Sequence, residues 1–164
     1  MKRMTGFTLF ELLFVLVIVA VLTAVAVPGL RGFSGGQDLK HIAQTLYSDL
    51  VYARSEAVKR NADVTLTAND GTWGDGWLVT DGAATAIDCD KAALEADVLR
   101  AGCDAADSGV RFETVPAGAI TFAGNGRAGG NARFVLCDAD RLHAREVRVG
   151  VDGLPEIRRL DACP

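Results

Sequence analysis

The sequence predicts an α+β fold in which a long N-terminal helix packs on a small antiparallel β-sheet. Three observations predict this fold. An unbroken apolar run occupies residues 7–27, a helical pattern follows over residues 37–61, and short alternating segments separated by turns fill the remainder. The chain has 164 residues, of which 49% are hydrophobic and 23% are charged. This length and composition suit one domain with one attached element and exclude a disordered chain.

The apolar run predicts a transmembrane helix, which we place at residues 7–29. The run contains 21 residues and a single charge, Glu11. A helix of that length spans about 31 Å, and the hydrocarbon core of a bilayer is about 30 Å thick. Lys2 and Arg3 precede the run, which places the N-terminus in the cytoplasm and the rest of the chain outside it. A cleaved secretory signal is the alternative, but its apolar region is only about 7–15 residues long.

The region after the run begins the exported domain, residues 30–164. Pro28 and Gly29 close the run and further glycines follow, so we expect a kink or a melted stretch there. Residues 37–61 then predict an amphipathic helix that ends near Asn61, because their apolar positions recur on one face of a 3.6-residue period. These positions are Leu39, Ile42, Ala43, Leu46, Leu50, Ala53 and Ala57.

Seven short segments after this helix predict the strands of the sheet. They cover residues 64–67, 77–80, 110–115, 120–123, 133–137, 145–151 and 156–160. Residues 81–108 are rich in Ala, Asp and Gly, so we expect a loop there with a short helix around residues 92–99. Trp73 and Trp77 are expected in the sheet and core rather than on a surface that stacks a ligand.

The charge balance and the rare residue types exclude several classes of function. The chain has 17 basic and 21 acidic residues, a net charge of −4, which argues against a protein dominated by a nucleic-acid-binding surface. The two histidines have no ligand-like spacing and are expected in solvent, and no catalytic pattern rises above chance. We therefore expect no enzyme, no metal and no cofactor.

Four cysteines in an exported domain predict two disulfides, because that compartment is oxidising. Three connectivities are possible for Cys89, Cys103, Cys137 and Cys163. We favour Cys89–Cys103 and Cys137–Cys163, which close loops of 14 and 26 residues and contribute about 3 kcal/mol each in the chain-entropy model. A zinc site is the alternative, but the sequence has no Cys-x-x-Cys pair.

The start of the chain, residues 1–11, reads MKRMTGFTLFE, with a short basic leader, Gly6, Phe7 and then Glu11. This pattern resembles the signal of class III prepilins. The resemblance implies a leader of residues 1–6, which the prepilin peptidase removes between Gly6 and Phe7 before Phe7 is N-methylated. A carboxylate in lipid costs roughly 2.5–3.5 kcal/mol and requires a partner. The resemblance supplies one, because Glu11 would neutralise the N-terminal amine of a neighbouring subunit during assembly.

Five runs in the exported domain form a recognisable pattern: LVYARSEAVKRN at residues 50–61, VTL at 64–66, GWLV at 76–79, ITF at 120–122 and FVLC at 134–137. With these runs the domain resembles the GspH/FimT family of minor pilins and pseudopilins. The resemblance implies the type IV pilin-like fold and a single-pass protein of the bacterial inner membrane, with its C-terminal domain in the periplasm and later in the pilus. Its implied partners are other major and minor pilins. The first of these runs favours a pilus subunit at or near the tip, and a type II secretion pseudopilin is the alternative.

DNA uptake is the remaining alternative, since some members of this family bind DNA through a Gly-Arg-x-Arg tail motif. The matching place here reads GLPEIRR at residues 153–159, where Leu154 replaces the first arginine and Glu156 intrudes. Only Arg158 and Arg159 are left to contact phosphate, and residues 61–107 carry ten acidic and two basic residues. DNA is therefore a partner that the sequence does not favour.

Overall fold

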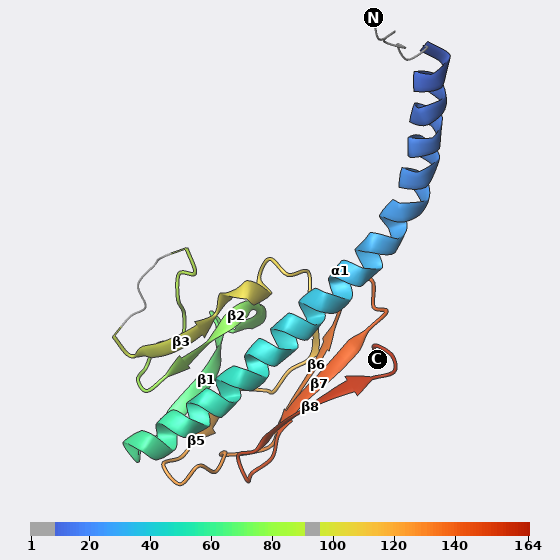
Figure 1. The fold of residues 1–164 in the computed structure, drawn as a ribbon. Coiled ribbons are helices and arrows are strands. Elements are labelled where there is room, and N and C mark those ends of the chain that lie inside the picture. Colours follow the sequence, from blue (N-terminus) through green and yellow to red (C-terminus); the bar gives the residue numbers. More distant parts are fainter. Residues whose placement is uncertain (1–8, 91–95) are drawn as a thin grey trace, which may run out of the picture. The chain divides into compact units, whose positions relative to one another are not determined.

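The computed structural model describes residues 9–90 and 96–164, with the side chains of residues 24–35 excepted. The chain divides into two compact units, residues Met1–Ser34 and Gly35–Pro164 (Figure 1). The first unit contributes the beginning of one long helix. The second contains the rest of that helix and all of the strands.

Helix α1, Leu9–Arg60, is assigned without a break. Of the two outcomes that Pro28 and the glycines predict, the melted stretch is therefore wrong and the kink stays a prediction. A proline removes a single intrahelical hydrogen bond and a glycine costs about 1 kcal/mol relative to alanine, which long helical segments on both sides can tolerate. The helix ends where the sequence predicts, since Asn61 takes the left-handed conformation (φ 50°) that commonly closes helices. Over the described residues, no helix has the length and hydropathy that crossing a membrane requires.

The strands form two four-stranded antiparallel sheets. The first sheet has the order β3-β2-β1-β5 and the second has the order β4-β6-β7-β8. The bounds are β1 Val64–Asn69, β2 Thr72–Thr80, β3 Val98–Gly102, β4 Arg111–Thr114, β5 Ile120–Phe122, β6 Ala132–Cys137, β7 Ala144–Val149 and β8 Pro155–Leu160. The predicted α+β architecture is thus confirmed, with its sheet divided in two.

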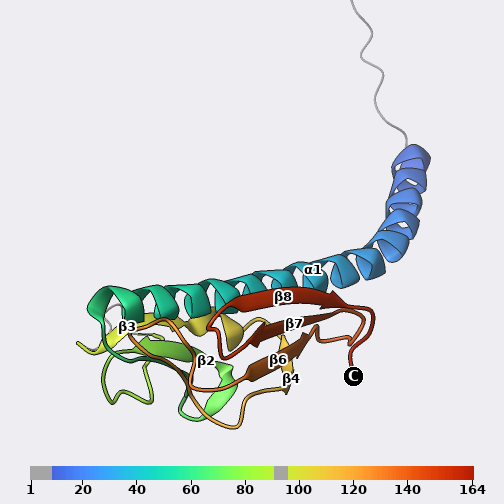
Figure 2. The same cartoon turned by 90° about the horizontal axis from the view of Figure 1, so that it is seen from below.

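The C-terminal part of α1 lies across both sheets and supplies the centre of the hydrophobic core (Figures 1 and 2). Its seven predicted apolar positions, from Leu39 to Ala57, are all buried. Leu66 and Trp77 face it from the first sheet, and Phe134 and Val147 face it from the second. The apolar face that the sequence predicts is therefore the face on which the domain is built.

Strand β3 corrects the predicted loop of residues 81–108. Val98–Gly102 pairs with β2 as the edge of the first sheet, and a short 3-10 helix, Cys103–Ala105, follows it. The predicted helix around residues 92–99 is wrong where it can be judged, since β3 begins at Val98, and residues 91–95 lie outside the described residues. Pairing with β2, which is remote in sequence, outweighs the local preference of this Ala-rich segment for helix.

Candidate functional site: the long helix and the network beneath it

The N-terminal part of α1 presents an apolar surface on all sides. Its large hydrophobic side chains from Leu9 to Leu22 are 43–83% exposed, and Glu11 is exposed in the first turn. A helix of a soluble domain shows apolar residues on one face only. This surface must therefore be covered by lipid or by other protein chains. The predicted cleavage position, between Gly6 and Phe7, lies outside the described residues.

The outward face of the C-terminal part of α1 is uncharged over four turns. At helical spacing it presents Gln44, Ser48, Val51, Ser55 and Val58, all exposed. A solvent-facing helix surface normally carries charged side chains. Small and uncharged residues instead allow another helix or domain to approach closely, so this face is suited to contact with a neighbouring subunit.

A groove of about 640 Å³ borders that face, between α1 and the start of β8. Val51, Val58 and Leu154 are exposed at this groove, and Tyr47 lines it. Arg54 crosses it, and its Nε donates a hydrogen bond to the Gly126 carbonyl oxygen at 2.9 Å. Figure 2 shows β8 beside α1 at this place. The groove adds apolar surface to the uncharged face of the helix.

A carboxylate is buried on the inward face of the same helix. Asp49 is 0% exposed, and its Oδ2 accepts a hydrogen bond from the Trp77 indole Nε1 at 2.8 Å. Arg100 Nε on β3 lies 2.8 Å from Asp49 Oδ1 and forms an ion pair with it. Burial raises the pKa of the Asp49 carboxyl above its ordinary value of 3.8, and the Trp77 hydrogen bond and the Arg100 charge offset this only in part.

Sequence reasoning missed this network, although one signal was present. Asp49 lies within the apolar stripe, three residues after Leu46 and four before Ala53, where a solvent-exposed charge does not fit. A charge at such a position requires a buried partner. The partner, Arg100, lies 51 residues away in a segment that the sequence predicts as a loop, and only the fold brings the two together.

A second buried carboxylate, Asp138, lies in the turn between β6 and β7. Burial favours its neutral form, but hydrogen bonds from the His143 side chain (2.7 Å) and backbone N–H (3.1 Å) outweigh it and hold the pKa of Asp138 below the ordinary value. His143 is therefore half-buried against Asp138, which corrects the expected solvated position. His41 is exposed as expected, and its Nε2 lies 3.2 Å from Asp104.

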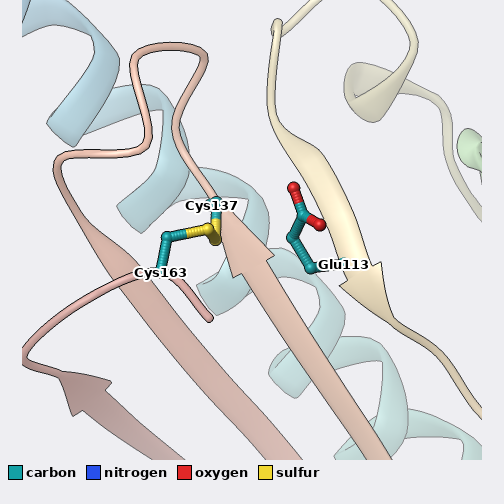
Figure 3. Close-up of side chains that lie close together, drawn as sticks. All are labelled: Glu113, Cys137 and Cys163. Atoms are coloured by element: carbon teal, nitrogen blue, oxygen red, sulfur yellow. A yellow bond between two sulfur atoms is a disulfide. The ribbon is translucent and has the colours of Figure 1, made fainter.

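Two disulfides are present, Cys89–Cys103 and Cys137–Cys163, and they are the pairs that the sequence favours. Within the described part of the chain, the only cluster of potential metal ligands is formed by Glu113, Cys137 and Cys163 (Figure 3). Both sulfur atoms are bonded to each other and neither is a thiolate, the form that binds metals. Glu113 in turn lies 3.0 Å from Arg141. These residues do not fit a metal centre.

Arg158 and Arg159 do not form a single surface. They are neighbours on β8, so their side chains point to opposite faces of the sheet. Arg158 Nη2 lies 3.0 Å from Glu156 Oε2, and the same carboxylate oxygen accepts a hydrogen bond from Arg148 at 2.7 Å. Arg159 is paired in register with Arg145 on the other face. The structure thus divides the two residues that a phosphate-binding tail would need together.

Comparisons with known proteins agree with this architecture. A model of the family described as type II transport protein GspH matches residues 43–154, and a model of the prokaryotic N-terminal methylation motif matches residues 1–27. No curated protein matches the chain. Among solved structures, the chain is similar to two crystal structures of the Pseudomonas aeruginosa type IV minor pilin FimU.

The first of these, in space group P21, has a TM-score of 0.61 at 22% identity over 80% of this chain and 99% of the FimU chain. The second, in space group P65, has a TM-score of 0.56 at 22% identity over 77% of this chain and 100% of that chain. At this identity the likeness establishes a shared fold. The GspH match covers more than half of the chain and the methylation motif covers its start.

Proposed function

This chain belongs to the family described as type II transport protein GspH, and from that premise we propose that it is a minor pilin of a type IV pilus. It is incorporated at or near the tip and acts by assembly rather than by catalysis. The observation that carries the proposal is the N-terminal methylation motif, continued by a helix whose large apolar side chains are exposed from Leu9 to Leu22. Each square ångström of apolar surface left in water costs about 25 cal/mol, so such a helix is built to be covered.

The precursor is a single-pass protein of the inner membrane. Residues 7–29 cross the bilayer, Lys2 and Arg3 stay in the cytoplasm, and residues 30–164 lie in the periplasm. Prepilin peptidase removes residues 1–6 and Phe7 becomes the methylated N-terminus. The charged side chains of Lys2 and Arg3 would oppose entry of the helix into an apolar bundle, and removing the leader allows it.

Assembly transfers the apolar helix from lipid to a bundle of pilin helices. Glu11 then pairs with the N-terminal amine of a neighbouring subunit, because a carboxylate at that depth requires a cation. The uncharged outward face of α1 and the groove beside it supply further contact surface for neighbouring major or minor pilins. The fold that this chain shares with FimU is consistent with such a role.

A secretion pseudopilin is the second candidate, because the family description itself refers to type II transport. The two candidates share processing, fold and membrane topology and differ in the filament that receives the subunit. The run ARSEAVKRN at residues 53–61 favours the pilus. A DNA receptor has less support, since Glu156 pairs with Arg158 and Arg159 faces the other way.

Mass spectrometry of the membrane-extracted protein tests the processing. We expect an N-terminal methyl-phenylalanine at Phe7, and an intact Met1 in cells that contain the peptidase would refute the proposal. Sheared filaments from the same cells test the destination. The chain should be recovered in the pilus fraction, and a deletion strain should lose pili while it retains type II secretion. The reverse pattern would assign the chain to the secretion system.

A further inference from the structure

Strand β3 carries the cation that compensates the buried carboxylate, and it lies at the edge of its sheet. It is an edge strand and pairs only with β2. At its N-terminal end, the Asp97 carbonyl oxygen accepts hydrogen bonds from Thr80 Oγ1 (2.8 Å) and from the Asp81 N–H (3.2 Å). At its C-terminal end the chain continues directly into Cys103, which is bonded to Cys89 with a Cα–Cα distance of 5.8 Å. The disulfide is therefore the covalent anchor of the end that leads away from Arg100.

Asp49 depends on Arg100 for the compensation of its Oδ1 atom. Its Oδ2 is satisfied by Trp77, but its Oδ1 accepts no hydrogen bond from any described residue. The guanidinium of Arg100 lies 2.8 Å from that oxygen without the geometry of a hydrogen bond, so its contribution is the charge itself. An uncompensated carboxylate in an apolar core is strongly destabilising. The position of β3 therefore decides whether α1 can bury Asp49 at low cost.

The end of β3 also fixes the other partner of Asp49. Gly102 is the register partner of Trp77, and the indole lies against its backbone so closely that an added Cβ would come within 2.2 Å of the ring. A shift of this strand end would change the space in which the indole lies. Arg100 and the backbone that packs against the Trp77 ring both lie within the three residues that precede Cys103.

We propose that the Cys89–Cys103 disulfide is a redox-sensitive latch that secures helix α1 on the first sheet by holding Arg100 and Trp77 against Asp49. In the oxidised chain the latch is closed, and the backbone amides of residues 44–58 of the helix are protected from exchange with solvent. Reduction removes the covalent link at the C-terminal end of β3 and leaves this end held by its pairing with β2 and by the buried Ala105 that follows it. Arg100 is then held less firmly against Asp49, and this part of the helix opens more often.

The chemistry is thiol–disulfide exchange. Cys89 and Cys103 thiols lose two electrons and two protons to the disulfide of an oxidant, which is released as two thiols, and a dithiol reductant reverses the reaction. An oxidising disulfide is available after export, so that clause of the inference rests on the proposed function. The latch itself is a property of the purified chain and is tested without a filament, so either conclusion can fail independently of the other.

The second disulfide provides a matched control. Cys137–Cys163 closes the longer loop, 26 residues against 14, and chain entropy alone predicts that its loss is the more destabilising. It joins β6 to the C-terminal segment, and no partner of Asp49 lies on that strand. A selective effect of Cys89–Cys103 on the helix would therefore not arise from loop closure.

Hydrogen–deuterium exchange of the full chain in detergent micelles tests the latch. In the Cys89→Ser/Cys103→Ser variant, we expect amides of residues 44–58 to exchange at least about tenfold faster, which corresponds to about 1.4 kcal/mol. The Cys137→Ser/Cys163→Ser variant should change them less than about threefold. Adding Asp49→Asn to the first variant should restore slow exchange, since the amide oxygen still accepts from Trp77 and needs no cation.

Two further arms cover a variant that does not fold. Dithiothreitol added to folded Cys137→Ser/Cys163→Ser protein reduces Cys89–Cys103 alone, and should accelerate the same amides. Arg100→Gln with both disulfides intact should do so as well, and Asp49→Asn should cancel its effect. Equal acceleration by loss of either disulfide, or an acceleration that Asp49→Asn leaves unchanged, would overturn the proposal.

Discussion

The two parts of helix α1 are continuous in backbone and opposite in surface. From Leu9 to Leu22 every large side chain is exposed, whereas from Leu39 to Ala57 seven apolar side chains are buried along one face. The first part has no core to join, so its apolar surface is available only to other molecules. The second part has used its apolar face to build the domain and leaves an uncharged face outside. One helix thus separates association from folding along its length.

This comparison implies that assembly depends on the first part of the helix and domain stability on the second, so a substitution in one part should change only one of these two properties. Side chains in the first part should affect assembly without affecting the stability of the domain. Side chains on the inward face of the second part should do the reverse. The following experiments test this separation, beginning with the largest expected effect.

The largest effect is expected at Glu11. Glu11→Ala removes a charge from the apolar helix, so insertion into the membrane should be at least as favourable as before. Incorporation into filaments should fall by at least about tenfold, because even one lost ion pair in a low-dielectric bundle exceeds 1.4 kcal/mol. The measurement is the ratio of the chain in sheared filaments to that in membranes. Wild-type incorporation would refute the pairing role of Glu11.

The inward face of the second part gives the next effect, and two adjacent residues provide the variant and its control. Leu50 is 0% exposed in the core, while Val51 is 42% exposed on the outward face. Leu50→Ala should lower the free energy of unfolding by about 2–5 kcal/mol through the cavity it creates. Val51→Ala should change it by less than about 0.5 kcal/mol. Denaturant titrations of the two variants that gave equal shifts would contradict the predicted inward and outward faces.

The sequence predicts this division of the helix because the division depends on the spacing of apolar residues that are close together in the chain. The positions from Leu39 to Ala57 recur every three or four residues, and the apolar run before them has no polar face. Methylation motif, helix end and most strands were likewise predictable, since each depends on a few neighbouring residues. The continuity of the helix past Pro28 was not, because local breaking signals do not report the length of helix on either side.

Features that depend on remote pairing were also missed. Val98–Gly102 has no strand signal strong enough to stand out from an Ala- and Asp-rich segment, and it becomes a strand because β2 offers an unpaired edge. Arg100 therefore could not be connected with Asp49 from the sequence. The division of Arg158 from Arg159 required only that residues 155–160 be a strand, which the sequence predicted almost to the residue.

A smaller effect concerns pH and distinguishes the buried Asp49 from Asp138. The pKa of Asp49 is raised in the folded state, so the folded state holds its proton more tightly and stability falls as pH rises from the ordinary value of 3.8 through the folded pKa. The stability of Asp49→Asn relative to wild type should therefore increase over that range. The pKa of Asp138 is lowered, so its stabilisation is present above the ordinary value and is lost as pH falls through the folded pKa.

Urea titrations at several pH values between 3 and 7 measure both differences. Asp138→Asn is the control, since its stability relative to wild type should change with pH in the opposite sense. If the stabilities of both variants followed the same trend with pH, the opposite pKa shifts assigned to Asp49 and to Asp138 would be wrong.

The smallest effect is expected for DNA binding. This measurement tests whether the charged residues of β8 pair within the domain or bind an external partner. Arg158 shares Glu156 with Arg148, and Arg159 lies on the other face of β8. Phosphate binding requires clustered cations, and the acidic residues of 61–107 repel phosphate over a Debye length of about 8 Å at physiological salt.

We expect labelled duplex to bind residues 35–164 weakly at low salt and not at physiological salt. Arg158→Ala/Arg159→Ala should then flatten the salt dependence by at most about two units, one for each lost phosphate contact. Tight binding that survives physiological salt and disappears in this variant would show that the domain, like the exposed helix, is directed to an external partner, and uptake of DNA would become its primary function.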